Sequence, residues 1–446
     1  MKNKLLVFLD HFIRKGVMFQ IISKELKKTE SYSAEELEAY QNFHLRKMIV
    51  YCYRYVPYYR NLFKKLHLKP EDIRTRDDLK KLPYLDKQIL KDQYKQLKSR
   101  SLRGFIHTTG RTSGTSGIPA TTLRDYYSIN FENAALWRFW GNAGDNGSKR
   151  VTLRGEIVVP VNQTEPPFWR YSADRSELVM SSYHLNMDNA GSYVRKINEH
   201  MPESIYAYPS SVYLLARYCQ ELNLKISVKV VFTSSEILTE KVRRLVEDTF
   251  GCKVFDWYGQ SERAAAAGMC ERGMYHLAED YSIVELADMG KGMEIIGTTL
   301  HNYAMPLLRY KTGDVVEVND GLCSCGRPSR AISGIKGRKP GFVWLANGGR
   351  IPSVLLEYSI DLATNVIEAQ LVQEKAGEII INVAGNGNFN SDDRIRLIEA
   401  AKKHTSMDMV VILNETKKIP RGPNGKFQHF LSRVVLQDND TLKLEV

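Results

Sequence analysis

A segment rich in hydroxyl and glycine residues is the part of the sequence best suited to bind phosphate. Residues 112–119 read TSGTSGIP and follow Thr108, Thr109 and Gly110. Small residues let the backbone approach a ligand closely, while hydroxyl and N–H groups can surround phosphate oxygens. The segment is not a Walker A loop, because no Gly-Lys-Ser/Thr follows a glycine at the required spacing. A flexible connector is the alternative interpretation.

Three further motifs carry charged groups suited to a nucleotide. Glu262, in DWYGQSE, could hold a Mg²⁺ that bridges phosphate oxygens, or it could be a surface glutamate capping a helix over 264–267. Asp314, in RYKTGD, could accept both hydroxyls of a ribose, although an ordinary Gly-Asp turn has the same residues. Lys426, in IPRGPNGK, lies in a loop fixed by glycine and proline, and could neutralise charge on a departing phosphate.

Four side chains could form a closed metal site. Five residues separate Cys270 from His276, and Cys323 and Cys325 form a C-x-C pair. Three thiolates and one imidazole make a tetrahedral Zn²⁺ set without an open position, so such a zinc would be structural. Because C-x-C is tighter than the usual C-x₂-C, four unrelated side chains are the alternative. The other cysteines, expected to pack in the core, are Cys52, Cys219 and Cys252.

Length and composition limit the classes of protein that fit. The chain has 446 residues, which predicts two or three domains, and its 43% of hydrophobic residues exclude disorder as the main state. The net charge of +12 suits anionic small molecules, a membrane surface or nucleic acid, and does not choose among them. The six cysteines are few for a disulfide-rich secreted chain. No apolar run reaches the roughly 18 residues of a membrane span, and Leu5–Leu9 is too short for a signal-peptide core, so a cytoplasmic location is expected.

The first hundred residues are expected to be helical. Apolar residues recur at helical spacing near the N-terminus, at Leu5, Phe8, Leu9 and Phe12. This helix could make a peripheral membrane contact, but packing on its own domain is favoured. Tyrosines and arginines around Pro57 could stack on bases; because proline ends a helix there and no nucleic-acid module surrounds it, an aromatic helix end is favoured. No nucleic-acid partner is therefore expected.

From about residue 104 to 335, short apolar runs alternate with helical patterns. A helix is expected over 238–251, and strands are expected at 151–159, 204–209, 228–235 and 252–259. This alternation predicts an α/β fold with a parallel sheet. Ligands bind beyond the carboxyl ends of such strands, and polar residues follow there directly in VVFTSSE and VFDWYGQSE.

A smaller α+β domain is expected after a linker at 336–341. WLANGGRIP predicts a hairpin, and the following segments read as two strands, a helix and a strand. The expected parts of the chain are thus a helical part, the α/β core and a small C-terminal domain, at 1–100, 101–337 and 338–446.

The order of these motifs resembles that of the adenylate-forming superfamily. TSGTSGIP, YGQSE, RYKTGD, KGR and PNGK follow one another, and the resemblance covers roughly residues 45–435. The nearest branch is the phenylacetate–CoA ligase family with its CapK-type relatives of capsular polysaccharide synthesis. The resemblance implies an ATP-binding adenylation core with parallel sheets and a mobile C-terminal lid, joined by a hinge at Lys339. Isoleucine and serine at Ile118 and Ser116 depart from the lysine and threonine of many members, and the pair Pro340-Gly341 after the hinge is unusual.

The resemblance also implies a role for each matching position. Lys426 would reach the α-phosphate of ATP and the substrate carboxylate, Glu262 would bind Mg²⁺, and Asp314 would hold the ribose hydroxyls with Arg338 nearby. The β- and γ-phosphates would lie on Ser113, Gly114, Thr115, Ser116 and Gly117. The residues flanking the adenine and the acid would come from two segments, Ser235 and Glu236, and Asp256, Trp257, Tyr258, Gly259, Gln260 and Ser261. A structural zinc on the four Cys and His residues is similar to one seen in some members of the family.

The implied activity is that of an ATP-dependent ligase. It would activate a carboxylic acid as an acyl-adenylate, with AMP and pyrophosphate as products, and transfer the acyl group to an acceptor, first of all CoA. A CapK-type enzyme that transfers an acyl or aminoacyl group to a sugar is the alternative, and a non-catalytic nucleotide-binding scaffold is the second. Aromatic residues within 137–185 and 207–260 could line an aryl-acid pocket or belong to the core.

Overall fold

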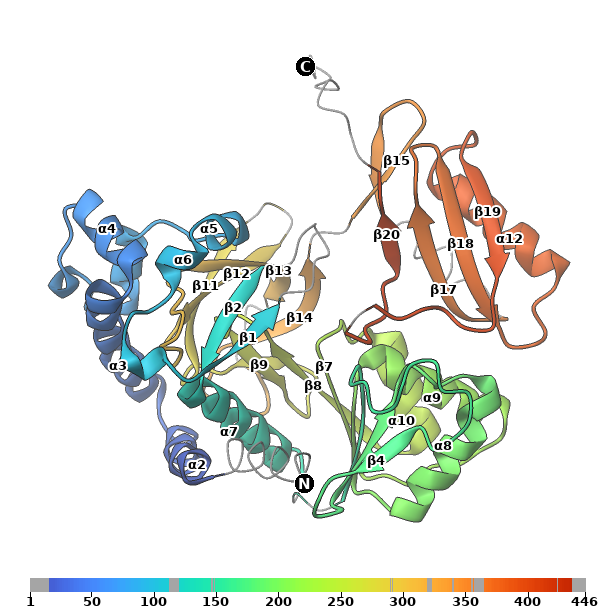
Figure 1. Cartoon of the computed structure of the whole chain (residues 1–446), viewed down its shortest axis with the longest axis horizontal. Coiled ribbons are helices and arrows are strands. Elements are labelled where there is room, and N and C mark those ends of the chain that lie inside the picture. The colour runs from blue at the N-terminus through green and yellow to red at the C-terminus, as the bar shows by residue number, and fades with distance from the viewer. Residues whose placement is uncertain are drawn as a thin grey trace.

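The computed structural model shows a large domain and a smaller C-terminal domain (Figure 1). The residues that it describes are 16–111, 120–145, 147, 149–288, 290, 292–318, 323–338, 341–353, 356, 365–422 and 424–434, without the side chains of Arg111 and Arg338. The expected phosphate-binding loop Ser113–Gly117, the hinge residue Lys339 and the apolar N-terminal residues around Phe8 lie outside the described residues.

The N-terminal part of the large domain is helical, as predicted. Ser33 begins α3 with a capping box, because its side chain accepts from the Glu36 N–H and the Glu36 carboxylate accepts from the Ser33 N–H. The chain turns at Val56, and Pro57 occupies the first position of the next helix, where its missing N–H costs nothing. The α-helices of this part are α2 (Val17–Thr29), α3 (Ala34–Tyr55), α4 (Pro57–Lys65), α5 (Lys87–Asp92) and α6 (Tyr94–Leu97), with 3₁₀ turns η1 (Pro70–Asp72), η2 (Arg76–Lys81) and η3 (Leu102–Gly104).

A large mixed sheet forms the centre of the molecule. Among the described residues it has 12 strands in the order β11-β12-β13-β14-β10-β9-β8-β7-β6-β3-β5-β4. The neighbours from β5 through β3, β6 and β7 to β8 are parallel, as predicted, whereas the remaining pairs are antiparallel. The strands are β3 (Arg150–Arg154), β4 (Trp169–Tyr171), β5 (Glu177–Ser181), β6 (Ser204–Ala207), β7 (Val230–Ser234), β8 (Lys253–Gly259), β9 (Ala266–Met269), β10 (Tyr275–Leu277), β11 (Ser282–Asp288), β12 (Met293–Thr299), β13 (Tyr310–Val318) and β14 (Ala331–Arg338).

Two sequence expectations for this sheet are wrong. The strand expected over 151–159 ends at Arg154, since Gly155 packs against the C-terminal domain and the residues after it form no ladder. The helix considered over 264–267 is absent: Ala264 and Ala265 are irregular and Ala266 begins β9, and the small side chains of all four alanines are fully buried where β9 joins β8 and β10. In addition, β14 extends to Arg338 and takes up the first half of the expected linker.

Helices cover both faces of the parallel strands. On one face α8 (Met187–His200), α9 (Pro209–Glu221) and α10 (Glu240–Phe250) bury an apolar core that includes Val151, Ile205 and Val231. On the other face α7 (Tyr126–Asn142) packs its aromatic residues against Tyr206 and Phe232. Cys52, Cys219 and Cys252 are buried in these cores, as expected for packing residues.

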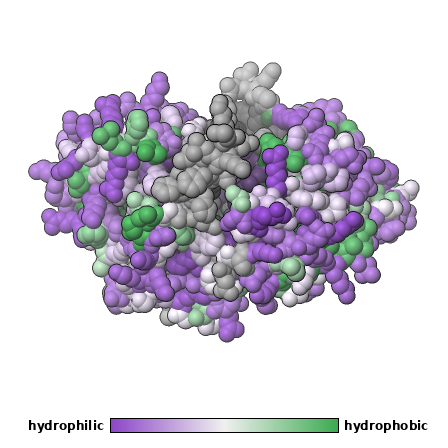
Figure 2. Space-filling model, turned by 60° about the horizontal axis from the view of Figure 1, so that its bottom comes forward, coloured by the Kyte–Doolittle hydropathy of each residue, from purple (hydrophilic) through white to green (hydrophobic). Residues whose placement is uncertain are grey.

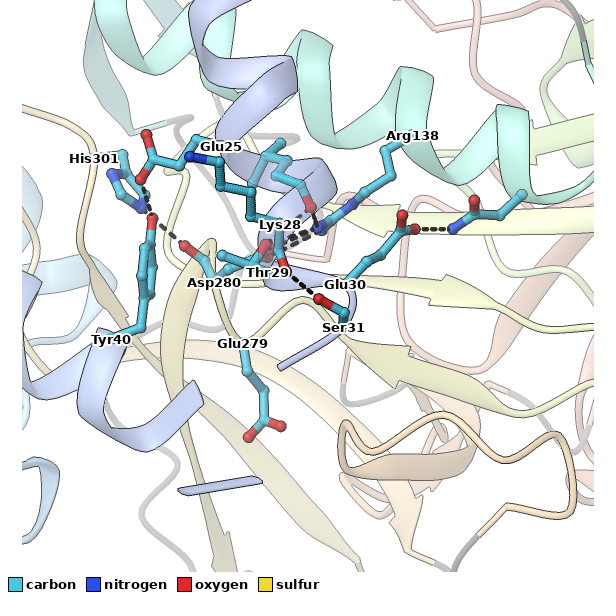
Figure 3. Close-up of polar contacts among 12 residues, drawn as sticks. Glu25, Lys28, Thr29, Glu30, Ser31, Tyr40, Arg138, Glu279, Asp280 and His301 are labelled. Atoms are coloured by element: carbon cyan, nitrogen blue, oxygen red, sulfur yellow. Dashed lines mark hydrogen bonds and ion pairs between the residues drawn. The ribbon is translucent and has the colours of Figure 1, made fainter. Parts of the chain in front are cut away.

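A buried ion pair fastens α2 to α7 and to the turn before β11 (Figure 3). Arg138 Nη1 and Nη2 lie 2.6 and 3.0 Å from the two carboxylate oxygens of Asp280, and Nη1 also donates to the Leu26 carbonyl at 2.8 Å. Although burial opposes the charge, Arg138 lowers the pKa of Asp280 below its ordinary value. Thr29 adds a hydroxyl donor to the same carboxylate. This network fixes α2 as part of the large domain.

The C-terminal domain is a compact α+β unit, as predicted. Its described strands form a four-stranded sheet in the order β19-β18-β17-β20, and Asn390 caps its helix α12. The expected hairpin is present as a separate pair, β15 with β16. The elements are β15 (Phe342–Trp344), β16 (Arg350–Pro352), β17 (Val366–Gln373), β18 (Glu378–Gly385), α12 (Ser391–His404), β19 (Val410–Glu415) and β20 (Phe430–Ser432).

The face of the molecule shown in Figure 2 is mostly hydrophilic where it is coloured. On the face shown in Figure 2, hydrophobic residues form small separate groups among hydrophilic ones. Within the described part of the chain, none of the helices combines the length and apolar character that crossing a membrane requires.

Candidate functional site

A cleft of about 1640 Å³ lies between the large domain and one loop of the C-terminal domain. Its walls come from the carboxyl ends of β7 and β8, from β3 and β5, from α7, and from Asn424 and Lys426. Ligands of α/β sheets bind at such strand ends. Most of the residues predicted from separate sequence motifs therefore meet at one cavity.

Lys426 reaches the end of β7. Its Nζ donates to the Ser235 carbonyl at 2.9 Å, and Ser235 has a left-handed backbone conformation with φ of 73°. This turn points the carbonyl into the cleft directly after the strand. Tyr208 supports the approaching loop, since its hydroxyl donates to the Asn424 carbonyl at 3.3 Å. The C-terminal domain thus places its predicted lysine at the large domain's predicted acid-binding segment.

Two glycines allow the domains to meet here. A Cβ on Gly155 would overlap the Asn424 carbonyl and lie 2.7 Å from the Gly425 Cα. Gly425 itself has a φ of +68°, which favours glycine. Backbone therefore packs directly on backbone, and no larger residue fits at position 155 in this arrangement.

Glu236 bridges the two domains. One carboxylate oxygen accepts from the Ser210 N–H at the start of α9, at 3.0 Å, and the other accepts from the Phe427 N–H at 2.9 Å. A carboxylate at a helix N-terminus is electrostatically favoured. The predicted acid-binding residue Glu236 thus holds the lysine loop in place in this structure.

Tyr258, Gln260 and Asp314 form a polar group on the wall formed by β8 and β13. The Tyr258 hydroxyl donates to Asp314 Oδ2 at 2.7 Å, and the Gln260 amide donates to Tyr258 and, at 3.4 Å, to the same Asp314 oxygen. Burial and the neighbouring Asp314 raise the pKa of Tyr258 well above its ordinary value, so its hydroxyl keeps its proton. The ladder register places Arg338 opposite Asp314. The predicted ribose-binding pair is therefore adjacent in the backbone.

Glu262 lies deeper in the cleft wall. Its side chain is only 3% exposed, and Oε1 accepts from the Tyr310 hydroxyl at 3.0 Å. The neighbouring Ser261 carbonyl accepts from the Thr122 hydroxyl at 3.2 Å, which ties this turn to β2 (Thr121–Asp125). A buried carboxylate facing a cleft is not the surface helix cap considered as the alternative, and its oxygens are suited to a hard cation.

Two members of the predicted binding segment have their side chains occupied within the protein. Asp256 is buried, and its carboxylate accepts from the hydroxyls of Thr233, at 2.5 Å, and Tyr275, at 2.8 Å. Burial raises the pKa of Asp256 to about 6. The Trp257 indole packs 5.4 Å from the Phe139 ring. Asp256, Trp257 and the nearby Gly259 also line the cleft.

The segment around the expected phosphate loop also reaches the cleft. β1 (His107–Arg111) and β2 pair antiparallel on either side of it, and Thr109, Gly110 and Arg124 line the cavity. The loop residues themselves lie outside the described part of the chain.

Arg154 is a site residue that sequence reasoning missed. Its guanidinium donates to the Tyr206 hydroxyl at 2.8 Å and to Ser235 Oγ at 2.9 Å, beside the contact made by Lys426. The missed signal was an arginine followed by glycine, in VTLRG, at the true carboxyl end of a parallel strand. Because the strand was expected to continue to 159, this end was not recognised.

The four predicted metal ligands converge beside β9 and β10. Cys270 Sγ lies 3.7 Å from Cys323 Sγ, Cys325 Sγ lies 3.2 Å from His276 Nε2, and all four ligand atoms lie within 4.8 Å of one another. A tetrahedral zinc with Zn–S bonds of about 2.3 Å separates its sulfurs by roughly 3.8 Å. His276 Nδ1 lies 3.2 Å from the Ser329 carbonyl, which orients Nε2 toward the thiols. The geometry therefore fits a tetrahedral ion, and the ligand set has no open position.

Known proteins resemble this chain in both sequence and fold. Residues 343–433 match the model of the CapK C-terminal domain. Protein CapK of Staphylococcus aureus is 26% identical over 92% of both chains, and a phenylacetate-coenzyme A ligase of Thermus thermophilus is 25% identical over 90% of this chain and 98% of its own. Among solved structures, 2-hydroxyisobutyryl-CoA ligase in the postadenylation state with R3-HIB-AMP has a TM-score of 0.67 at 17% identity, with 91% of each chain covered. The chain is thus a relative of CapK and the phenylacetate–CoA ligases, and it has the adenylate-forming CoA ligase fold.

Proposed function

We propose that this protein is an ATP-dependent ligase that activates a carboxylic acid as an acyl-adenylate and passes the acyl group to an acceptor, CoA in the first place. The observation that carries the proposal is the convergence of Lys426, Asp314 and Glu262 on one cleft, although they lie on different elements of two domains. The relationship to phenylacetate–CoA ligases supports the same reaction class.

The nucleotide would lie along the wall of the large domain. Asp314, opposite Arg338, would accept the ribose hydroxyls, and Glu262 would hold Mg²⁺. The loop Ser113–Gly117 would lie over the β- and γ-phosphates. When bound, Mg²⁺ would neutralise charge on the phosphate oxygens.

Lys426 would act at the reacting atoms. A carboxylate oxygen of the acid attacks the α-phosphorus, the bond to the bridging oxygen of pyrophosphate breaks, and the acid becomes a mixed anhydride with AMP. The Lys426 ammonium would stabilise the charge that develops on the transferring phosphate and orient the carboxylate. The acceptor then displaces AMP by attack on the carbonyl carbon.

Cys270, His276, Cys323 and Cys325 would hold a structural Zn²⁺. Support comes from the donor set and from the sulfur–sulfur distance of 3.7 Å. With all four positions filled by protein, the ion would join the β9–β10 hairpin to the segment before β14 without touching substrate.

The second candidate function is acyl transfer to a sugar. Two observations favour it: the C-terminal domain matches the CapK model, and CapK is a relative over 92% of the chain. The acceptor therefore has to be identified by experiment.

Pyrophosphate release from Mg-ATP, measured with a panel of carboxylic and amino acids, tests the proposal. Release that requires an acid and falls at least about 100-fold in Glu262→Gln supports it. Glu317→Gln changes an exposed carboxylate and should leave the rate unchanged. Adding CoA or an amino sugar then identifies the acceptor by which of them yields acylated product. If no acid supports release or ATP–pyrophosphate exchange, the protein is a nucleotide-binding scaffold instead.

A further inference from the structure

Arg154 supplies positive charge to the part of the cleft that is proposed to bind the acid. The described hydrogen-bond partners of its guanidinium are the neutral hydroxyls of Tyr206, Ser235 and Tyr208. The Glu156 carboxylate interacts with Arg154 electrostatically, but the ion pairs between described residues do not include Arg154. Its Nε has no hydrogen-bond partner among described atoms. The Lys426 ammonium lies on the carbonyl of the same Ser235. Two cations at one serine, one of them with an unpartnered N–H at Arg154 Nε, attract a carboxylate.

A carboxylate lies farther into the same cleft. Glu177, on β5, borders the cavity, and among the described residues the hydrogen bond to its carboxylate comes from the Thr152 hydroxyl. The ion pairs of the described chain do not include Glu177 either. Its carboxylate thus retains free acceptor positions toward the cavity.

The nearest arginine on the adjacent strand is occupied elsewhere. Arg150 is the register partner of Glu177, but its guanidinium lies 2.8 Å from Asp145 and stacks 3.9 Å above the Trp140 ring. Arg150, Trp140 and the Trp137 indole, which lies 4.8 Å from the same guanidinium, line the cleft beside Glu177. Arg150 is therefore paired with Asp145, and its charge does not neutralise Glu177 directly.

Arg154, which supplies the positive charge, lies on β3 close to Thr152, whose hydroxyl bonds the Glu177 carboxylate. Thr152 and Arg154 are two residues apart on the same strand and thus on the same face, a separation of about 6.6 Å. Val179 and Tyr206 line the cavity beside them. A small molecule with a carboxylate at one end and a cation at the other would match this distribution of charge.

We propose that the acid activated by this protein is an amino acid in the broad sense, a carboxylic acid that carries an ammonium group. Its carboxylate would lie at Arg154 and Lys426, ready for adenylation, and its ammonium would pair with Glu177 beside Thr152. An apolar acid would instead desolvate the Glu177 carboxylate without replacing its water, which is unfavourable. This inference rests on the proposed ligase activity.

ATP–pyrophosphate exchange with matched acids tests it on the full chain. The pairs are alanine or β-alanine against propanoate, γ-aminobutanoate against butanoate, and para-(aminomethyl)phenylacetate against para-methylphenylacetate. In at least one pair we expect kcat/KM to be about tenfold or more higher for the amino member. Glu177→Gln should reduce that preference about tenfold, because kcat/KM falls for the amino member and stays equal or rises for its amine-free partner, which no longer desolvates a carboxylate. Glu177→Asp, which keeps the charge, should retain the preference.

Controls separate this subsite from other causes. Glu199→Gln removes an exposed carboxylate paired with Lys196 and should change nothing. Arg154→Gln should lower exchange for both members of each pair alike, because both carry the carboxylate. A thermal melt of each variant shows that it folds. Equal activation of both members, with a ratio unaffected by Glu177→Gln, would overturn the amino-acid inference and leave the ligase intact. Absence of exchange with every acid would overturn both.

Discussion

The two sides of the cleft are held in different ways. On the large-domain side, Asp314 and Glu262 are nearly buried and bonded to tyrosines of the same domain, Tyr258 and Tyr310. On the other side, Lys426 lies on a loop whose described contacts across the cleft include hydrogen bonds to Ser235, Glu236 and Tyr208 and one close approach of glycines. The wall proposed to bind the nucleotide is therefore formed when the large domain folds, while the lysine is present only when the domains are docked. An enzyme with two successive half-reactions can use this difference, since moving one loop changes the chemistry without disturbing the wall.

The largest effect on activity is expected from removing Lys426, which the C-terminal domain brings to the cleft. We expect Lys426→Ala to lower the rate of adenylation by about 10³-fold, because the charge on the transferring phosphate loses its nearest protein cation. Lys417→Ala, an exposed lysine of the same domain, serves as the control. ATP–pyrophosphate exchange measures the effect, and a melting temperature equal to the parent's checks that the wall is intact. A loss of less than tenfold would contradict the proposed role.

The next largest effect is expected from a substitution that prevents the loop of the C-terminal domain from packing on Gly155. Gly155→Ala adds a Cβ that overlaps the Asn424 carbonyl, so we expect exchange to fall about 100-fold although Lys426 is still present. Small-angle scattering should show a more extended molecule. Gly191→Ala, on a helix position with open space around it, should behave like the parent. Unchanged exchange in Gly155→Ala would show that this arrangement is not the one that adenylates.

Removal of the proposed zinc should lower the stability of the large domain. We expect one zinc per chain, and Cys325→Ser or a strong chelator should remove it and lower the melting temperature by roughly 10 °C, since metal binding contributes directly to folding free energy. Cys252→Ala, outside the cluster, should keep its metal. Elemental analysis together with calorimetry measures both quantities. A parent protein without zinc after expression in zinc-supplemented medium would rule out the metal site.

The smallest effect is expected from a substitution in the wall proposed to bind the nucleotide. Tyr258→Phe removes the 2.7 Å hydrogen bond to Asp314, and a lost bond to a charged group is worth roughly 1.5 kcal/mol. We expect the KM for ATP to rise about tenfold with little change in kcat. Tyr84→Phe, a half-exposed tyrosine outside the cleft, is the control. A fall in kcat at constant KM would instead assign Tyr258 to the chemical step.

Local sequence patterns predicted the parallel half of the sheet and the ends that carry the site. Buried runs such as VVFTS end in polar residues, and Ser235 and Gln260 follow β7 and β8 where expected. The antiparallel half was harder to predict, because β9 reads AAGM and has neither β-branched residues nor alternation. Its strand character depends on neighbouring strands far away in the chain.

The roles of single residues were less predictable than their location. Glu236 was expected beside the acid, yet its carboxylate bonds N–H groups from both domains, a contact that only the docked arrangement creates. Arg154 had no motif of its own and is identified by its neighbours in space. The convergence of the four candidate metal ligands, in contrast, was predictable because the types of the side chains alone restrict what they can bind.

One strand, β14, runs from beside the candidate metal cluster to the boundary with the C-terminal domain. β14 begins at Ala331, just after the segment that contributes Cys325 and the carbonyl contacting His276, and it finishes at Arg338, next to the passage into the smaller domain. Beside the start of β14, the Cys325 thiol lies 3.2 Å from the His276 imidazole of the hairpin, and β14 pairs from Ile332 to Arg338 with β13, the strand that carries Asp314. A movement of the small domain would therefore act on a strand that is already paired along its length, so Asp314 would keep its position in the sheet.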